Sequence, residues 1–219
     1  MSVISPEKIL NYLIMVSNQN LWLNALIHLM VLTAMLVLIF GKNTKNKKWV
    51  VDGVICLLFI SIVSVAIVYG NPFHLLTMGL LAIFAVIELW QGKNEFITPK
   101  INLHTLIAFV SIIIGFCYPE FVKANPIGLL LVSPAGIVPC PTLLIVLGLL
   151  TLAYPKVNKI QYLMTVLIGT FYGVTGVFQL KVFLDMAIII IVGYAFFCLN
   201  KTWAQRSNQQ NKSVKCDHP

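Results

Sequence analysis

Four side chains that could bind a solute or exchange a proton stand inside long apolar runs of this sequence: His28, His74, Cys140 and Asp185. Ionisable groups within membrane spans are costly, and by default they mark a transport pathway or a buried pair. A thiol can bind a soft metal or take part in redox chemistry, and an imidazole titrates near neutral pH. These residue types predict a polar site inside a membrane protein.

The stretch VSPAGIVPCPT, residues 132–142, indicates where that site lies. It falls within an apolar run of 30 residues, Asn125–Tyr154. Such a run is too long for one upright membrane crossing and too short for two. Three prolines predict two half-helices, roughly 125–133 and 142–154, joined by unwound backbone. The residues that we expect to form this break or hinge are Pro134, Gly136, Pro139 and Pro141.

Unwound backbone at membrane depth is tolerated only where protein or a water-filled cavity satisfies its polar groups. The break is therefore the best pointer to a binding site in this chain.

The composition fixes the broad class of protein. Of the 219 residues 59% are hydrophobic and 10% are charged, and the mean hydropathy is +0.91. One membrane domain accounts for nearly the whole chain and leaves no room for a soluble catalytic domain. The net charge of +8 does not indicate nucleic-acid binding, because the basic residues lie in loops and not in an aromatic-lined patch.

The apolar runs predict an all-α, polytopic transmembrane bundle of about seven spans, the fifth of them broken by proline. The expected spans are 21–40, 50–69, 72–90, 101–117, 125–154, 160–180 and 182–199. Residues 1–19 are expected to form an amphipathic segment that lies on the outer surface of the membrane, residues 20–200 the transmembrane domain, and residues 201–219 a disordered basic cytoplasmic tail. Only Lys181 separates the last two spans, so a tight turn there and a sixth span ending near Phe178 fit equally well.

Twelve of the 15 Lys and Arg residues fall on one side of these spans. The other three are Lys8, Lys123 and Lys181. Basic loops stay in the cytoplasm, so the N-terminus is predicted outside and the C-terminus in the cytoplasm.

In this orientation several polar groups share the outer half of the membrane. We expect an outward-facing pocket lined by His28, His74, Cys140 and Asp185, with Thr142 at the start of the second half-helix. Each has a simpler interpretation. His74 and Asp185 could be interfacial, His28 could bond to neighbouring backbone or to Asn24, and Cys140 could be a small apolar filler.

Two further groups of residues have roles in this topology. Asp52, Glu88 and His104 near the cytoplasmic side would suit an inner gate, although Glu88, two residues before Trp90, is more simply an interfacial anchor. Gly169, Gly173 and Gly176 predict a smooth helix face for close packing against the broken span or a second subunit. An oligomer is therefore compatible with the sequence.

The string GIVPCPT, residues 136–142, followed by LGLL, residues 147–150, resembles the central motif of an uncharacterised bacterial integral-membrane family, domain of unknown function 6064. Further matches follow in family order: Asn18 with Trp22, Asn71-Pro72, Tyr118-Pro119, Gly169 and Gly173, and Asp185. Leu23 departs from the family pattern, which often has proline there. The resemblance implies a multi-span bacterial inner-membrane protein but no activity.

The leading functional hypothesis is a small-solute or ion transporter whose site lies at the break. The alternatives are a non-transporting accessory or structural membrane subunit and a membrane-embedded enzyme that uses Cys140 as its nucleophile. The sequence has no Gly-x-x-x-x-Gly-Lys, His-Glu-x-x-His or Cys-x-x-Cys motif, and it identifies no cofactor and no metal. Cys216 and His218 in the tail make a poor metal site. The expected partners are the lipid bilayer and a small solute or ion.

Overall fold

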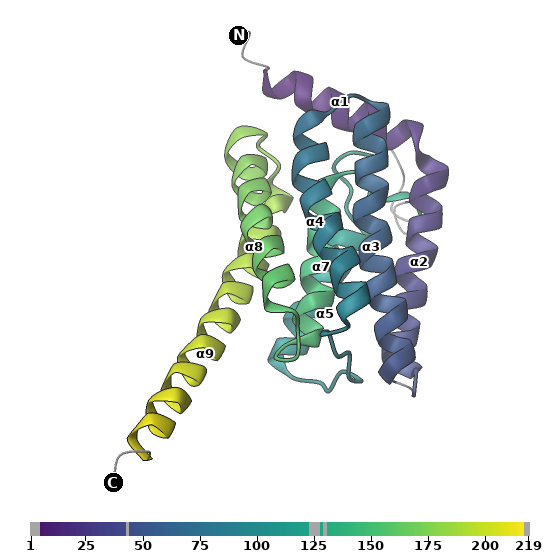
Figure 1. Ribbon diagram of the computed structural model, residues 1–219. Helices are drawn as coiled ribbons and strands as arrows, with labels where there is room; N and C mark the ends of the chain where they lie inside the picture. Colours follow the sequence, from purple (N-terminus) through teal and green to yellow (C-terminus); the bar gives the residue numbers. More distant parts are fainter. Residues whose placement is uncertain (1–4, 43, 123–127, 129–130, 217–219) are drawn as a thin grey trace.

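The structure is a computed structural model that describes residues 5–42, 44–122, 128 and 131–216, with side chains described up to residue 201. This part of the chain forms helices and connecting turns, with no strand, so the all-α prediction is confirmed for it (Figure 1). The helices are α1 (Pro6–Gln19), α2 (Leu21–Phe40), α3 (Thr44–Val68), α4 (Pro72–Gln91), α5 (Leu103–Phe116), α7 (Pro139–Ala153), α8 (Lys159–Val174) and α9 (Met186–Cys216). A π-helical turn, η1 (Thr175–Gln179), and a short 3-10 turn, η2 (Phe183–Asp185), connect α8 to α9.

The prediction of seven spans is not supported. Among the described residues five helical segments are long and apolar enough to cross a membrane: Leu21–Phe40, Thr44–Val68, Pro72–Gln91, Lys159–Gln179 and Phe183–Lys201. The expected fourth span becomes α5, with 14 residues, and the second half of the expected fifth span becomes α7, with 15 residues. At about 1.5 Å per residue, neither reaches the roughly 30 Å thickness of the hydrocarbon core.

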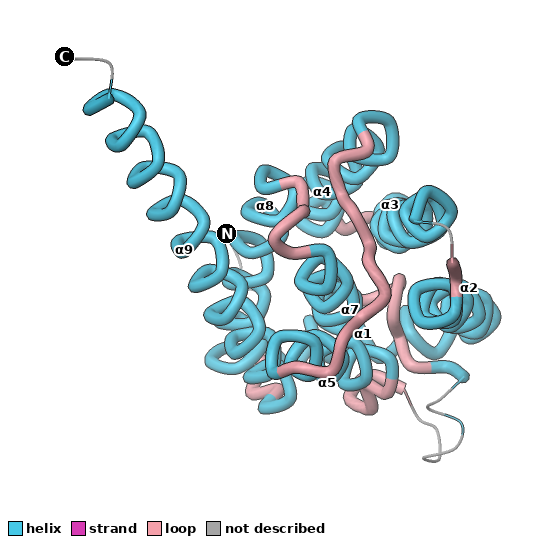
Figure 2. Tube along the Cα trace, turned by 90° about the horizontal axis from the view of Figure 1, so that it is seen from below, coloured by secondary structure: helices cyan, strands magenta, loops and turns pink. Residues whose placement is uncertain are grey.

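The apolar character of α7 comes from its position in the centre of the bundle. All of its residues except Leu152 are buried. Seen along the bundle, α7 lies inside, with α3, α4, α5 and α8 around it (Figure 2). A helix that is hydrophobic on every side can be either a membrane span or a helix buried in the centre of a large bundle. This is why the sequence pattern alone overestimates the number of spans.

The bundle has two ends that differ in charge. Helix α1 and the α3–α4 and α8–α9 turns lie at one end, here called the α1 end (Figure 1). The α2–α3, α4–α5 and α7–α8 connections lie at the opposite end. These connections and the adjoining helix ends carry most of the lysines, so this is called the lysine-rich end.

The α8–α9 connection is a tight turn, one of the two arrangements that fit the sequence. Lys181 adopts a left-handed conformation with φ of 58°, and the amide of Val182 donates to the carbonyl of Gly176 at 2.9 Å. The glycine face of α8 packs chiefly against α9. A Cβ on Gly173 would lie 3.1 Å from Ile189, and one on Gly169 would lie 3.1 Å from Val192. The tight turn brings α9 back along α8, so the main partner of these glycines is the last span.

The C-terminal segment differs from the predicted disordered tail, because α9 continues as helix to Cys216. Residues 194–216 contain no proline or glycine and several good helix formers such as Ala, Gln, Lys and Arg. The tail motif that ends in His218 falls partly outside the described residues.

Candidate functional site

The break in the apolar run is present, but it is shorter than predicted: Pro139 and Pro141 lie in the first turn of α7, where proline is tolerated, and not in unwound backbone. Leu131 and Val132 are helical, residues 133–138 form turns, and α7 begins at Pro139. The rest of the predicted first half-helix, apart from Gly128 and Ser133, lies outside the described residues. The amide of Gly136 donates to Thr142 Oγ1 at 2.7 Å, and Thr142 Oγ1 donates to the carbonyl of Val138 at 2.8 Å. Thr142 therefore satisfies a buried amide that the unwound backbone leaves without a helical partner.

Glycine is required at the centre of this turn. Gly136 has a φ of 75°, and a Cβ there would lie 2.3 Å from the side chain of Ile27. Two further hydrogen bonds tie the neighbouring residues to other elements: Asn24 Nδ2 donates to the carbonyl of Val132 at 3.2 Å, and the side chain of Ser133 accepts from the amide of Tyr118 at 3.1 Å. The break is thus held by α2 and by the chain after α5.

The first turn of α7 places Cys140 next to a buried carboxyl group. Cys140 Sγ donates to Asp185 Oδ2 at 3.2 Å, and Tyr118 Oη donates to Asp185 Oδ1 at 2.5 Å. All three side chains are buried, and no ion pair reaches Asp185 within the described part of the chain. One thiol and one phenol are therefore the side-chain donors to an acid inside the bundle.

The π-helical turn makes room for this carboxyl group. A Cβ on Gly176 would lie 1.8 Å from Asp185 Oδ2, so no other residue fits at this position without moving Asp185. π-Helical turns occur often at functional sites. Gly176 thus accommodates the Asp185 carboxyl group as well as allowing close helix packing.

A cavity of about 310 Å³ opens beside Cys140 at the α1 end of the bundle. Four parts of the chain line it: α1, the start of α4, the break with the start of α7, and the end of α8 with η1. Its polar lining residues are Asn71, His74, Cys140, Tyr172 and Thr175, and the others are apolar or glycine.

His74 is the titratable group in this cavity whose ring is free to meet a ligand. Its ring nitrogens take part in no hydrogen bond among those formed by the described residues, and its ring lies 5.8 Å from that of Tyr172. Asn71, in contrast, uses its side-chain oxygen to cap α4 at the amide of His74, at 3.0 Å. Tyr172 shares a hydrogen bond of 2.8 Å with Thr77. The cavity therefore offers an unbonded imidazole beside a thiol.

The structure brings together three of the five residues predicted to contact a solute. His74 and Cys140 line the cavity, and Asp185 bonds to Cys140 behind it. His28 does not line the cavity: its ring nitrogens contact the carbonyl oxygens of Asn24 and Phe116, at 2.8 and 3.0 Å. Thr142 is buried within the break. Backbone bonding accounts for both of these positions.

A second polar cluster, which the sequence showed only in part, lies at the lysine-rich end. Its members are Asp52, Glu88, Asn94, Asn158 and Gln161, and all are buried. Asn94 Nδ2 donates to Asp52 Oδ1 at 2.8 Å and to Gln161 Oε1 at 3.1 Å. Glu88 is fully buried, so it is not an interfacial anchor. His104 bonds elsewhere, to Tyr194 and to the carbonyl of Thr151, so it does not join Asp52 and Glu88.

Sequence reasoning missed the three amide residues of this cluster. Asn158 caps α8, accepting from the amides of Ile160 and Gln161, and an asparagine before an apolar helix is a recognisable capping signal. No sequence signal indicated that Asn94 would lie between two carboxyl groups, because that contact depends on how α3, α4 and α8 pack.

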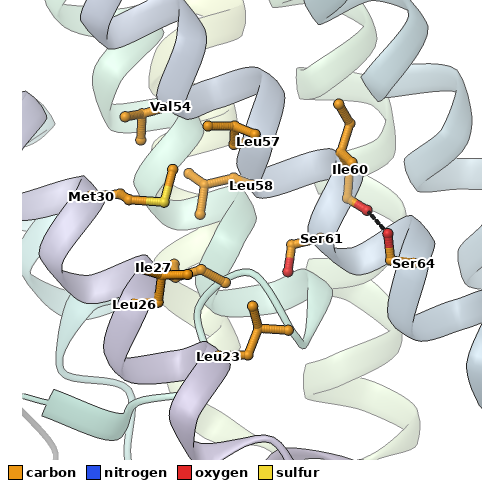
Figure 3. Close-up of a pocket in the computed structure, with 10 residues that line it drawn as sticks. All are labelled: Leu23, Leu26, Ile27, Met30, Val54, Leu57, Leu58, Ile60, Ser61 and Ser64. Atoms are coloured by element: carbon orange, nitrogen blue, oxygen red, sulfur yellow. Dashed lines mark hydrogen bonds between the residues drawn. The ribbon is translucent and has the colours of Figure 1, made fainter.

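Another cavity, of about 220 Å³, lies between α2 and α3 and is lined mainly by apolar side chains (Figure 3). Its polar members are Ser61 and Ser64, and Ser64 Oγ donates to the carbonyl of Ile60 at 2.9 Å. None of the predicted site residues lines it, and it offers no titratable group.

Comparisons with protein-family models, curated proteins and solved structures find no match to this chain. The resemblance to domain of unknown function 6064 stays a prediction. No group of three or more His, Cys, Asp or Glu side chains that could hold a metal occurs among the described residues.

Proposed function

We propose that this protein carries a small solute or ion across a membrane and that the cavity at the break is its binding site. The proposal places the chain in a bacterial inner membrane with the α1 end outside. The cavity then faces the exterior, and the lysine-rich end faces the cytoplasm, as basic loops do.

The observation that carries this proposal is the unbonded His74 imidazole in a cavity whose wall contains Cys140 bonded to buried Asp185. The cavity, at about 310 Å³, falls at the small end of ligand sites, which are mostly apolar with a few placed polar groups. An apolar lining with one imidazole and one thiol suits a small, weakly polar solute, or a solute that loses most of its hydration shell when it binds. Such a solute would contact His74 and Cys140.

Accessibility of Cys140 tests the site directly. A variant that keeps Cys140 as its only cysteine, with Cys56, Cys117, Cys198 and Cys216 changed to alanine, is treated in intact cells with small, membrane-impermeant methanethiosulfonate reagents. We expect labelling of Cys140, and we expect Phe171→Trp, which narrows the cavity, to slow it several-fold. The matched control keeps Cys56, which is buried but does not line this cavity, and should not be labelled.

Flux measurements in proteoliposomes test transport itself. Imposed gradients of sodium, potassium, methylammonium, acetate and chloride are applied one at a time, and the resulting currents are recorded. We expect a current for at least one probe, which falls at least tenfold in His74→Ala and is unchanged in Thr33→Ala, an exposed position on α2. Labelling of Cys140 without any solute flux would support the accessory-subunit alternative, and an inert Cys140 would contradict the proposed site.

A further inference from the structure

The cluster at the lysine-rich end contains two carboxyl groups that differ in their hydrogen bonding. Glu88 Oε1 accepts from the amide of Asn94 at 2.6 Å, and Glu88 Oε2 accepts from Asn158 Nδ2 at 2.5 Å. Each oxygen of Glu88 thus accepts a hydrogen bond from a donor. Asp52 has one such contact, from Asn94 Nδ2 to Oδ1.

The other oxygen of Asp52 has no partner. Asp52 is 2% exposed, and its Oδ2 is buried without a hydrogen bond. Because an unpaired carboxylate oxygen inside a protein carries the full cost of lost hydration, a buried acid in this position favours a bound cation or a proton.

No neighbouring cation balances this charge through direct contact. The charged groups that act on Asp52 are Glu88 from α4 and Lys48 from α3, while α8 contributes the neutral Gln161. The Lys48 ammonium lies over Gly92 at the C-terminal end of α4, where a Cβ would be 1.7 Å from it. Lys47 donates to Thr98 at 2.5 Å, and the one ion pair among the described residues joins Lys156 and Glu95. Two carboxyl groups therefore share a site without an ion-paired partner.

A pocket lies beside this cluster at the lysine-rich end. It has a volume of about 290 Å³ and is lined by Thr44, Lys45, Lys48, Asn94, Glu95 and Ile97. Asn94 borders the pocket and is itself buried, and its side chain donates to Asp52, so a proton that arrives through the pocket has to pass Asn94 to reach Asp52.

We propose that Asp52 is a proton-binding site, loaded on Oδ2 from the side of the pocket at the lysine-rich end. The step is simple protonation: a hydronium ion gives its proton to Asp52 Oδ2 and leaves as water. The site goes beyond the proposed transport function and does not depend on it. It lies at the opposite end of α4 and α8 from the cavity, which those helices line with His74 and Tyr172.

Infrared difference spectroscopy of the full-length protein tests this site. The protein is prepared with 13C-labelled aspartate carboxyl groups, and spectra are recorded while the pH is lowered. We expect an isotope-shifted carbonyl stretch of a protonated aspartic acid that grows as the pH falls and is lost in Asp52→Asn. Asparagine keeps the oxygen that accepts from Asn94, so the variant is expected to fold. Asp185→Asn is the matched control and should retain this band.

Exchange into deuterium oxide tests access through the pocket. The Asp52 band should shift promptly in the native protein and several-fold more slowly in Ile97→Trp, which narrows the pocket without touching the cluster. A spectrum in which Asp52→Asn removes no titrating band would overturn the proposal. So would stabilisation by sodium that Asp52→Asn abolishes, because that result assigns Oδ2 to a metal cation.

Discussion

The Thr142 side chain, predicted to contact a solute, forms hydrogen bonds with the backbone of the break. The sequence places it at the start of a half-helix, as a candidate solute contact. In the structure its hydroxyl group accepts from the amide of Gly136 and donates to the carbonyl of Val138. Both of its hydrogen-bonding functions are therefore used inside the break.

Replacing Thr142 by valine keeps the shape of the side chain and leaves the buried Gly136 amide unpaired. An unsatisfied buried donor costs about 1–3 kcal/mol, so the free energy of unfolding in mixed detergent micelles should fall by that amount. Thr142→Ser keeps the hydroxyl group and is expected to lose less than half as much. A stable Thr142→Val variant together with a destabilised Thr142→Ser variant would show that the methyl group, and not the hydrogen bonds, matters.

The role of Tyr118 at the site depends on its hydroxyl group. Its hydroxyl group donates to Asp185 Oδ1, so Tyr118→Phe removes one of the two side-chain donors to that buried acid. We expect a loss of about 1–3 kcal/mol in the free energy of unfolding. Tyr69→Phe is the control, because its hydroxyl group donates to Gln19 in an exposed position and accepts from Asn20 in a partly buried one, so its loss should cost less, under about 1 kcal/mol. The contact is not important if both variants unfold alike.

At the scale of elements, the contact between α5 and α7 depends on two glycines. A Cβ on Gly115 would lie 2.5 Å from the carbonyl oxygen of Pro141, and one on Gly148 would lie 2.7 Å from that of Ala108. Backbone atoms cannot move aside as flexible side chains can. The central helix can approach α5 closely only where both helices lack a Cβ.

Gly148→Ala should therefore force α5 and α7 apart. Overpacking of this kind costs about 1–3 kcal/mol, measured as a lower free energy of unfolding. The control is Gly193→Ala on α9, where no atom lies within 4 Å of the added Cβ. That change should leave stability equal or raise it by about 0.5–1 kcal/mol, because alanine favours helix. A neutral Gly148→Ala would mean that the two helices do not pack this closely.

At the scale of the whole molecule, the polar groups are divided between the two ends of the bundle. The cavity with His74 and Cys140 lies at the α1 end, and the cluster around Asp52 lies at the lysine-rich end. Between them α7 is buried and almost entirely apolar. A solute crossing the protein would thus meet a closed centre in this conformation, as in a transporter open to one side at a time.

The proposed orientation can be tested with single cysteines at the two ends. In a cysteine-free background Lys181→Cys, at the α1 end, should react with an impermeant reagent added to intact cells. Lys93→Cys, at the lysine-rich end, should react only after the membrane is opened, because basic loops remain in the cytoplasm. Both positions are exposed, so a difference in labelling between them reflects the side of the membrane and not burial of the thiol. The reverse pattern would invert the proposed topology.

The sequence by itself determined the class of protein and the position of the break. Long apolar runs dictate apolar helices, and Pro134, Pro139 and Pro141 cannot lie within one unbroken helix. It also indicated Cys140, His74 and Asp185 as candidate site residues, because ionisable groups in apolar helices are costly and usually mark a functional site or a buried pair.

The tertiary structure alone decided how many helices are long enough to span, and which polar groups meet. The hydrophobic pattern of a helix indicates how much of its surface is kept from water. The centre of a bundle and the lipid of a membrane are equally apolar, so the sequence of α7 has the pattern of part of a membrane span. Partners are set by packing: His28 bonds to backbone, whereas Asn94, unremarkable in sequence, bridges Asp52 and Gln161. Such contacts join residues far apart in the chain, and no local pattern encodes them.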